Sequence, residues 1–564
     1  MTNQVKQIDS VLDQYVTAYA RIDPFKASEW GISGCDAFLP DYSPPGISER
    51  YNLRKDTLER VAKTPKGSAR EIREAKGFTL WAGAEQEKFE SGFLTSEISG
   101  TNSPIQVFAE TLKLMDVSNE AAVGNLTRRF LALDQAFTGL ITTMKESRDR
   151  GWVFPQEVME MVLEQATVLA NPDHDIYEDK RAEMNDTRLS QMSQRAFERG
   201  VVTAQGVFSE MADYLRQEIL PACSPIGPID PHSYFISLSG IGVTDPNPGE
   251  LFETASQDLV RLRASCDQLR SELGDEPAYR LSDLEVADGF NVLTWAMEDA
   301  WEGFHSRVDP ELAGLVNPET SPLKWENDPH GCLVHPYYSA GIRLTKNNRV
   351  LPRKCAASRA PYSYRGTENP TVTSGEAFDS FLEIDNRYFA VASLEKGIPG
   401  SHLYSRAREA FGANLFTRIA ARLPISNLGW DLFALEMAPQ LWDIPREVNL
   451  QIQERLMHYT ALALADLQLY GAQGKGKTWG LPEAVEYLSD TVSLPGNRML
   501  LQQRYLGVPA LSVAPWYGWR RWKAIYQQFL ASGGTGFADF VRKVAPAGAV
   551  HFEVLADAAS DQNN

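Results

Sequence analysis

Hydrophobic residues recur at intervals of three and four along most of the chain, which is the spacing of one face of an α-helix. Clear examples run over residues 8–22, 126–144 and 259–273. The third is preceded by Asn247-Pro248, a pair that suits a helix start. We therefore predict a mainly α-helical fold in which these apolar faces line the core.

Alternating patterns typical of β-strands are confined to residues 233–243 and 371–385, and residues 346–349 suit the turn of a hairpin. We therefore expect a small β-sheet beside the helices. Two stretches rich in proline and glycine, 221–249 and 308–370, are the expected junctions or long surface loops.

Composition places the chain among folded globular proteins, because 43% of its 564 residues are hydrophobic and 23% are charged. The length allows several average domains or one large helical body. The formal net charge of -19 repels nucleic acid and anionic membrane surfaces. We expect neither as a partner.

The five cysteines lie far apart and form no Cys-x-x-Cys pair, which argues against a disulfide framework or a cysteine-rich zinc site. The first residues lack the basic stretch and apolar run of a secretory signal. No segment approaches the roughly 18 apolar residues of a membrane span. These features predict a cytoplasmic protein, and they leave the oligomeric state open.

Two motifs carry most of the chemical information: residues 394–403 (LEKGIPGSHL) and residues 427–436 (NLGWDLFALE). They resemble the bacterial domain-of-unknown-function 885 family, whose members look like helical zinc metallopeptidases. That family carries His-Glu-Gly-x-Pro-Gly-His-His-Leu and, further on, Glu-Gly-Trp-Ala-Leu-Tyr. The resemblance runs from Pro24 to Gly518. It implies a two-lobed, zincin-like body with a central cleft, made of a helical lobe over 1–230 and a second lobe over 231–564 in one continuous unit.

The chain departs from the family where the zinc chemistry would lie. Aligned on the shared Pro-Gly, Glu395 and Lys396 replace the family's first histidine and its glutamate. Ser401 replaces the first of the paired histidines, and Leu428 replaces the later glutamate. A catalytic zinc ion needs about three protein ligands, and an ammonium group beside it opposes its binding. We therefore expect no metal and no cofactor.

The predicted catalytic residues are Glu395, Lys396, His402 and Asp431. Together they could donate, accept and shuttle protons without a metal. A desolvated lysine could also act as a base or form an imine, and Asp431 could replace the lost glutamate. A structural alternative stays open for each: a solvated Lys-Glu pair, a histidine held in the core, and an aspartate that faces solvent.

The predicted substrate-binding residues begin with Arg504 and Tyr505, which match a pair near the family's substrate cavity. Arginine binds carboxylates with two parallel bonds, and tyrosine can donate to a developing oxyanion. Ser401, Trp430 and Trp516 complete the set. Ser401 equally suits a helix start, and the tryptophans equally suit core packing.

These residues predict a metal-independent enzyme that acts on a small substrate containing a carboxylate or a carbonyl. Its acid/base chemistry would be that of a cyclase, lyase, isomerase or hydrolase. Two alternatives stay open. The chain could be a pseudo-metallopeptidase that binds a peptide, a metabolite or a partner, or a metallopeptidase with a rebuilt metal site.

Overall fold

The computed structural model describes residues 7–92, 103–171, 177–185, 187–227, 229–273, 286–317, 343–344, 350–351, 386–470, 479–491 and 508–561.

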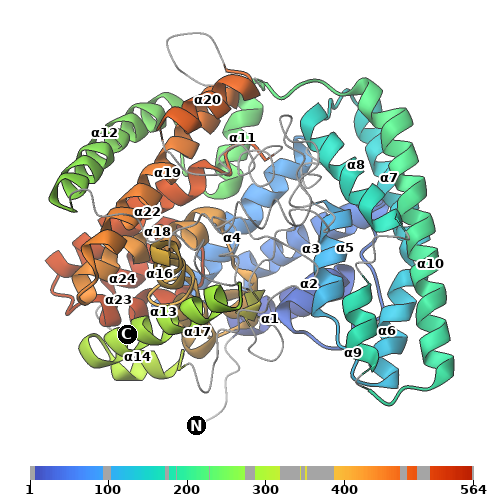
Figure 1. Ribbon diagram of the computed structural model, residues 1–564, viewed down its shortest axis with the longest axis horizontal. Helices are drawn as coiled ribbons and strands as arrows, with labels where there is room; N and C mark the ends of the chain where they lie inside the picture. Colours follow the sequence, from blue (N-terminus) through green and yellow to red (C-terminus); the bar gives the residue numbers. More distant parts are fainter. Residues whose placement is uncertain are drawn as a thin grey trace.

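The described N-terminal part consists of helices, several of which pack around α10 on the right of Figure 1. Their bounds are α1 (Gln7–Ile22), α2 (Pro24–Trp30), α3 (Pro44–Lys63), α4 (Ala69–Glu90), α5 (Pro104–Leu114), α6 (Glu120–Leu131), α7 (Leu133–Asp149), α8 (Gln156–Ala170), α9 (Glu178–Asn185), α10 (Gln191–Tyr214), the π-helix η1 (Leu215–Ile219) and the 3₁₀ turn η2 (Leu220–Ala222).

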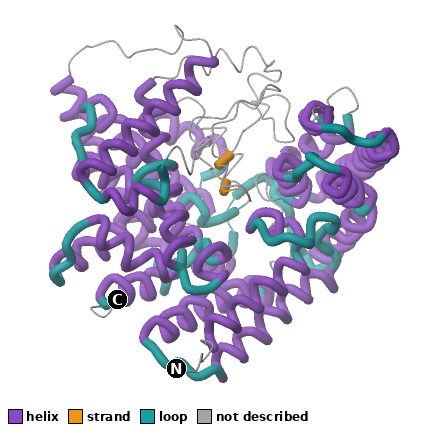
Figure 2. The backbone as a smooth tube through the Cα atoms, turned by 90° about the horizontal axis from the view of Figure 1, so that it is seen from below, coloured by secondary structure: helices purple, strands orange, loops and turns teal. Residues whose placement is uncertain are grey.

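The described C-terminal part is also helical and holds one short strand pair (Figure 2). Its elements are α11 (Pro231–Ile241), α12 (Pro248–Leu273), α13 (Val286–Arg307), α14 (Pro310–Gly314), β1 (Arg343–Leu344), β2 (Val350–Leu351), α16 (Asn386–Lys396), α17 (Ser401–Phe411), η4 (Phe416–Ala420), α18 (Pro424–Leu441), α19 (Arg446–Tyr470), α20 (Leu481–Thr491), α22 (Val513–Ala531), α23 (Phe537–Val544), η6 (Ala545–Ala547) and α24 (Phe552–Ser560).

The mainly α prediction is confirmed, and the three patterned segments are helical. Residues 8–22 lie in α1, and residues 259–273 lie in α12, which begins at the predicted Pro248. Residues 126–144 form two helices, α6 and α7, that meet at Ala132. The apolar side chains of that segment face one core across the junction, which explains why the periodicity runs through it without a break.

The predicted small β-sheet is wrong. Residues 233–243 fall mainly in α11, whose start is capped by Asp230 and whose end is marked by Gly242 at φ 106°. Because α11 is buried on most sides, it lacks the one-sided pattern by which a helix is recognised. Residues 371–385 lie outside the described residues. Residues 346–349 also lie outside the described residues, and the sheet among the described ones is the antiparallel pair of β1 and β2, with two residues in each strand.

Helix α19 runs through the core of the C-terminal part. Every residue from Arg455 to Tyr470 is buried, and the helix packs against α12, α16, α20 and α22. A helix that is buried all round is normally apolar. This one also carries Arg455, His458 and Asp466, so it brings ionisable groups into the interior.

Helices α18 and α22 approach each other closely at two glycines. A Cβ on Gly518 would lie 1.8 Å from the carbonyl oxygen of Ile425, and a Cβ on Gly429 would lie 2.4 Å from the backbone of Gly518. Both glycines belong to the family resemblance. Their role in this chain is therefore to let two helices touch.

Contacts join the N-terminal helices to the C-terminal ones. The amide of Leu415 donates to Asp13 Oδ1 at 2.6 Å, and Asn414 donates to Asp9 at 3.1 Å. One hydrophobic core extends from Ile8 to Ala559. The division at residue 230 stays a prediction. Among the described helices, none combines the length and the hydropathy that a membrane crossing needs.

Candidate active site

The first motif forms the tight connection between α16 and α17. Helix α16 ends at Lys396, and the amides of Gly397 and Gly400 return to the carbonyls of Ser393 and Leu394, at 2.8 and 3.0 Å. A Cβ on Gly400 would lie 1.8 Å from the carbonyl oxygen of Glu395, so this path requires glycine. The connection presents Lys396 and Ser401 to α18.

Five side chains from four helices form a continuous polar group, which we call the Lys396 cluster. The Lys396 ammonium binds Asp431, and the Ser401 hydroxyl donates to the other oxygen of Asp431. Lys396 Nζ also lies 3.0 Å from Glu395 Oε1. Arg455 donates to Glu395 Oε2 from Nε at 2.8 Å and pairs with it through Nη2 at 2.7 Å. The structure thus unites Glu395, Lys396, Ser401 and Asp431, four of the predicted site residues.

The charges of the Lys396 cluster balance inside the protein. Glu395, Lys396, Asp431 and Arg455 are exposed by 1, 4, 3 and 2%, while Ser401 is partly exposed. Two cations face two carboxylates, which is the arrangement that buried charges require. The solvated Lys-Glu pair and the solvent-facing aspartate are therefore excluded as interpretations.

The two carboxylates differ in acidity although both are buried. Burial favours the neutral form of Glu395, but Arg455 and Lys396 outweigh it and hold the pKa of Glu395 below its ordinary value. Burial raises the pKa of Asp431, and the nearby charge of Glu395 adds to the rise. Lys396 and Ser401 oppose that rise without cancelling it.

The cluster does not fit the zinc ion that the family resemblance implies. The carboxylates of Glu395 and Asp431 are engaged by the Lys396 ammonium, which occupies the position between them. A zinc ligand set needs such oxygens or imidazoles to be open to the metal. In the part of the chain that the structure describes, no group of three His, Cys, Asp or Glu side chains could hold a metal ion.

His402 and Trp430 are part of the core around the cluster. His402 lies in the first turn of α17 with 1% of its surface exposed. Trp430 is fully buried, stacks on Tyr404 at 4.4 Å between ring centroids, and donates from Nε1 to the carbonyl of Pro399 at 3.1 Å. Trp430 therefore holds the turn between α16 and α17 in place.

Trp516 is buried in a different set of contacts. Its Nε1 donates to Asp258 Oδ2 at 2.9 Å, and Arg520 donates to the same carboxylate at 2.7 Å. These bonds tie α22 to α12. The role observed for Trp516 is therefore structural. Arg504 and Tyr505, the other predicted substrate-binding pair, lie outside the described residues.

Arg455 is the member of the cluster that sequence reasoning missed. It lies 60 residues beyond Glu395, in no motif, so only the folded chain brings the two together. One signal was present in the sequence. An arginine that opens the mainly apolar segment of residues 455–470 needs a buried acidic partner.

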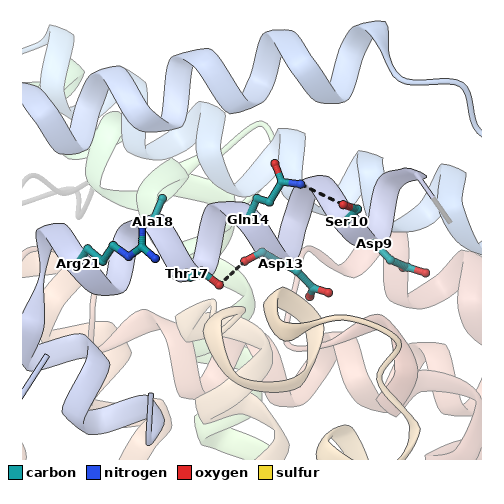
Figure 3. Close-up of a pocket in the computed structure, with 7 residues that line it drawn as sticks. All are labelled: Asp9, Ser10, Asp13, Gln14, Thr17, Ala18 and Arg21. Carbon is teal, nitrogen blue, oxygen red and sulfur yellow. Dashed lines mark hydrogen bonds between the residues drawn. The ribbon is translucent and has the colours of Figure 1, made fainter. Parts of the chain in front are cut away.

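A separate hollow of about 560 Å³ lies along α1 (Figure 3). The described residues that line it all belong to α1, and none is a predicted site residue. Gln14 donates to Ser10 at 3.0 Å, and Thr17 donates to the carbonyl of Asp13 at 2.8 Å. Other polar groups of this hollow bind neighbouring elements: Asp9 pairs with Arg70 at 2.8 Å, and Arg60 donates to Gln14 at 2.6 Å.

Comparisons with known proteins agree with the family resemblance. The family model described as "Bacterial protein of unknown function (DUF885)" matches residues 24–305. No curated protein matches the chain. A putative lipoprotein from Colwellia psychrerythraea is similar in structure, with a TM-score of 0.77, 12% identity and 98% of each chain covered. A putative lipoprotein of unknown function from Shewanella oneidensis has a TM-score of 0.63 and 12% identity, over 97% of this chain and 98% of its own.

Two expectations change with these comparisons. The comparisons contradict the predicted cytoplasmic location, because both similar structures are described as putative lipoproteins. The lack of a recognisable secretory signal is weak support for a location. Neither structure is described as a peptidase, so the metallopeptidase-like description gains no support from them.

Proposed function

Since the chain belongs to the DUF885 family, whose description supplies no activity, we propose from the site itself that it is a metal-independent acid/base enzyme. Its substrate is a small molecule with a carboxylate or a carbonyl group. Asp431 transfers the proton, and Lys396 stabilises the negative charge that develops on the substrate oxygen. The observation that carries this proposal is the contact of Asp431 with both the Lys396 ammonium and the Ser401 hydroxyl.

The opposite pKa shifts of the two carboxylates support these roles. A pair of titratable groups whose environments push their pKa values apart is a common sign of an acid and a base with separate tasks. Glu395 stays ionised and holds Lys396 and Arg455 in position. Asp431, with its raised pKa, is the better group to take up a proton and return it.

The reaction begins with removal of a proton from the carbon next to the substrate's carbonyl or carboxylate. The C–H bond breaks, the proton goes to Asp431, and the electron pair moves onto the substrate oxygen beside the Lys396 ammonium. This enol-forming step is shared by isomerisation, elimination and cyclisation. Ser401, the partly exposed member of the cluster, is the group that meets the substrate first.

The burial of the cluster favours a second candidate function, a binding protein without catalysis. Glu395, Lys396 and Asp431 are almost fully enclosed in the structure, and a balanced buried cluster also serves as an internal clamp. In that case α16, α17 and α18 form a rigid support for a ligand or partner that binds elsewhere.

Proton exchange tests the proposal and does not require the product to be identified. The protein, treated with a chelator, is incubated in D₂O with a panel of 2-oxo acids, 3-oxo acids, hydroxy acids and amino acids. We expect the NMR signal of a carbon-bound proton in at least one compound to disappear. In Asp431→Asn, the exchange should slow by about 100-fold or more, the usual contribution of a general acid or base.

Asp309→Asn is the matched control, because Asp309 is an ion-paired carboxylate far along the chain that binds Arg542 at 2.9 Å. Its exchange rate should equal that of the unmodified protein. Equal rates in Asp431→Asn would contradict the proposed role of Asp431. Exchange that chelation abolishes would favour the rebuilt metal site, and no exchange with any compound would favour the binding protein.

A further inference from the structure

A second buried polar group, outside the Lys396 cluster, joins α11, α19 and the turn over residues 508–512. We call it the Asp466 centre. Tyr234 donates its hydroxyl to Asp466 Oδ1 at 2.6 Å, and the amide of Ala510 donates to the same oxygen at 3.0 Å. Ser512, which immediately precedes α22, lies close enough for its hydroxyl and amide to act on the carboxylate.

The two carboxylate oxygens of Asp466 differ in their hydrogen bonds. Oδ1 accepts two hydrogen bonds, whereas Oδ2 is buried and has no hydrogen-bond partner among the described residues. Ser512 Oγ is likewise buried without a partner of its own. An ionised carboxylate needs donors on both oxygens, while a protonated one carries a donor itself. A proton on Oδ2 would satisfy both atoms at once, by donation to Ser512 Oγ.

The surroundings of Asp466 favour the protonated form of its carboxyl group. Its side chain is 2% exposed, and the described groups that act on it, Tyr234, Ala510 and Ser512, are all neutral. No cation is among these described groups, so burial raises the pKa of Asp466 to about 7, and the hydrogen bonds reduce the rise only in part. The ring of Tyr470 stacks on that of Tyr234, with 6.3 Å between the centroids.

The backbone at Ala510 is held in an unusual conformation to make this contact. Its φ is 71°, in the left-handed region that residues with a Cβ rarely adopt. Such strain persists only where the surroundings enforce it. The bond from the Ala510 amide to Asp466 is therefore a specific feature of the turn that leads into α22.

We propose that Asp466 is a neutral carboxylic acid whose Oδ2–H donates to Ser512 Oγ, and that loss of this proton loosens the turn before α22. The junction between α19 and α22 is then a pH-sensitive contact. Helix α22 packs directly on α18, which carries Asp431, so the contact supports one wall of the Lys396 cluster.

Infrared difference spectroscopy of the whole protein tests the protonation state. The spectrum of the unmodified protein minus that of Asp466→Asn should contain the C=O band of a protonated carboxyl group at pH 6. The band should fade with a midpoint near pH 7. A difference spectrum at pH 6 that contains only carboxylate bands would overturn the proposal.

A second variant distinguishes the direction of the bond with Ser512. If Ser512 accepts from neutral Asp466, Ser512→Ala removes a partner of the neutral form and moves the midpoint of the band to lower pH. If Ser512 donates to an ionised carboxylate, the same change moves the midpoint to higher pH. The second result would overturn the proposal even if Asp466→Asn failed to fold.

Hydrogen exchange of the peptide that contains residues 508–512 tests the loosening. After correction for intrinsic rates, protection in the unmodified protein should fall as the pH rises through 7. Asp466→Asn should show no such fall, because its amide continues to donate to Ser512 Oγ. The same pH dependence in both proteins would refute the pH-sensitive contact.

Discussion

The Lys396 cluster and the Asp466 centre both hold carboxyl groups in the interior of the protein. The two sites stabilise opposite protonation states of these groups. In the cluster, Lys396 and Arg455 bring two cations to two carboxylates, and the pKa of Glu395 falls. In the centre, the described neighbours of Asp466 are neutral, and its pKa rises to about 7. Burial is common to both, so the cations decide which carboxyl group remains ionised.

Asp431 lies between these two extremes and is informative for that reason. It shares the Lys396 ammonium, yet its pKa is raised because burial and the charge of Glu395 act together. One cation is therefore not enough to hold two adjacent buried carboxyl groups ionised with equal ease. In the proposed reaction, this difference makes Asp431, rather than Glu395, the group that exchanges a proton.

The largest effect should come from removing the shared cation. Lys396→Met leaves Glu395 and Asp431 without their common partner and should lower the free energy of unfolding by about 3–5 kcal/mol. Urea unfolding at neutral pH measures it. Lys63→Met, which breaks an exposed pair with Glu59 at 3.2 Å, is the control and should cost less than about 1 kcal/mol. A similar loss of unfolding free energy in the two variants would show that the buried ion pairs contribute no more to stability than the exposed pair.

The pH dependence of stability should come next in size. The pKa of Asp466 is raised on folding, so the folded state holds a proton that the unfolded chain releases between pH 4 and pH 7. Rising pH therefore lowers stability in that window, by roughly 2–3 kcal/mol between pH 5 and pH 7 for one such group. Unfolding of the unmodified protein and of Asp466→Asn should diverge by this amount. Parallel curves would mean that Asp466 is ionised throughout.

The smallest effect should come from relieving the strained backbone of the Asp466 centre. Ala510→Gly should stabilise the protein by about 0.5–1 kcal/mol, because glycine adopts positive φ without the penalty of a Cβ. Thermal unfolding measures the change. Ala182→Gly, in the exposed middle of α9, should instead destabilise by about 1 kcal/mol. Destabilisation in both variants would show that the turn is not strained.

Hydrophobic periodicity in the sequence predicts the amphipathic helices correctly. It does not identify helices that are buried on most sides. Helix α1 has one apolar face, and its bounds followed from that face. Helix α11 is buried on most sides, so its pattern carries no clear period of 3.6 residues and resembles that of a strand.

The motif identified four members of the Lys396 cluster but not their contacts. Lys396 and Asp431 are 35 residues apart, and they meet only because Gly400 permits the turn between α16 and α17. Tyr234 and Asp466 are 232 residues apart and lie in no shared motif. Contacts over such separations depend on how helices pack, which single-sequence patterns do not encode.

The most direct test of the account is a carbon-13 NMR titration of protein labelled at the carboxyl carbons of aspartate and glutamate. Difference spectra with Asp431→Asn and Glu395→Gln assign the two signals. We predict that Asp431 titrates above ordinary aspartates and Glu395 below ordinary glutamates, because the two cations favour Glu395. If Asp431 titrated at or below the ordinary aspartate range, the pair would lack separate acid and base roles, and the proposed chemistry would be contradicted.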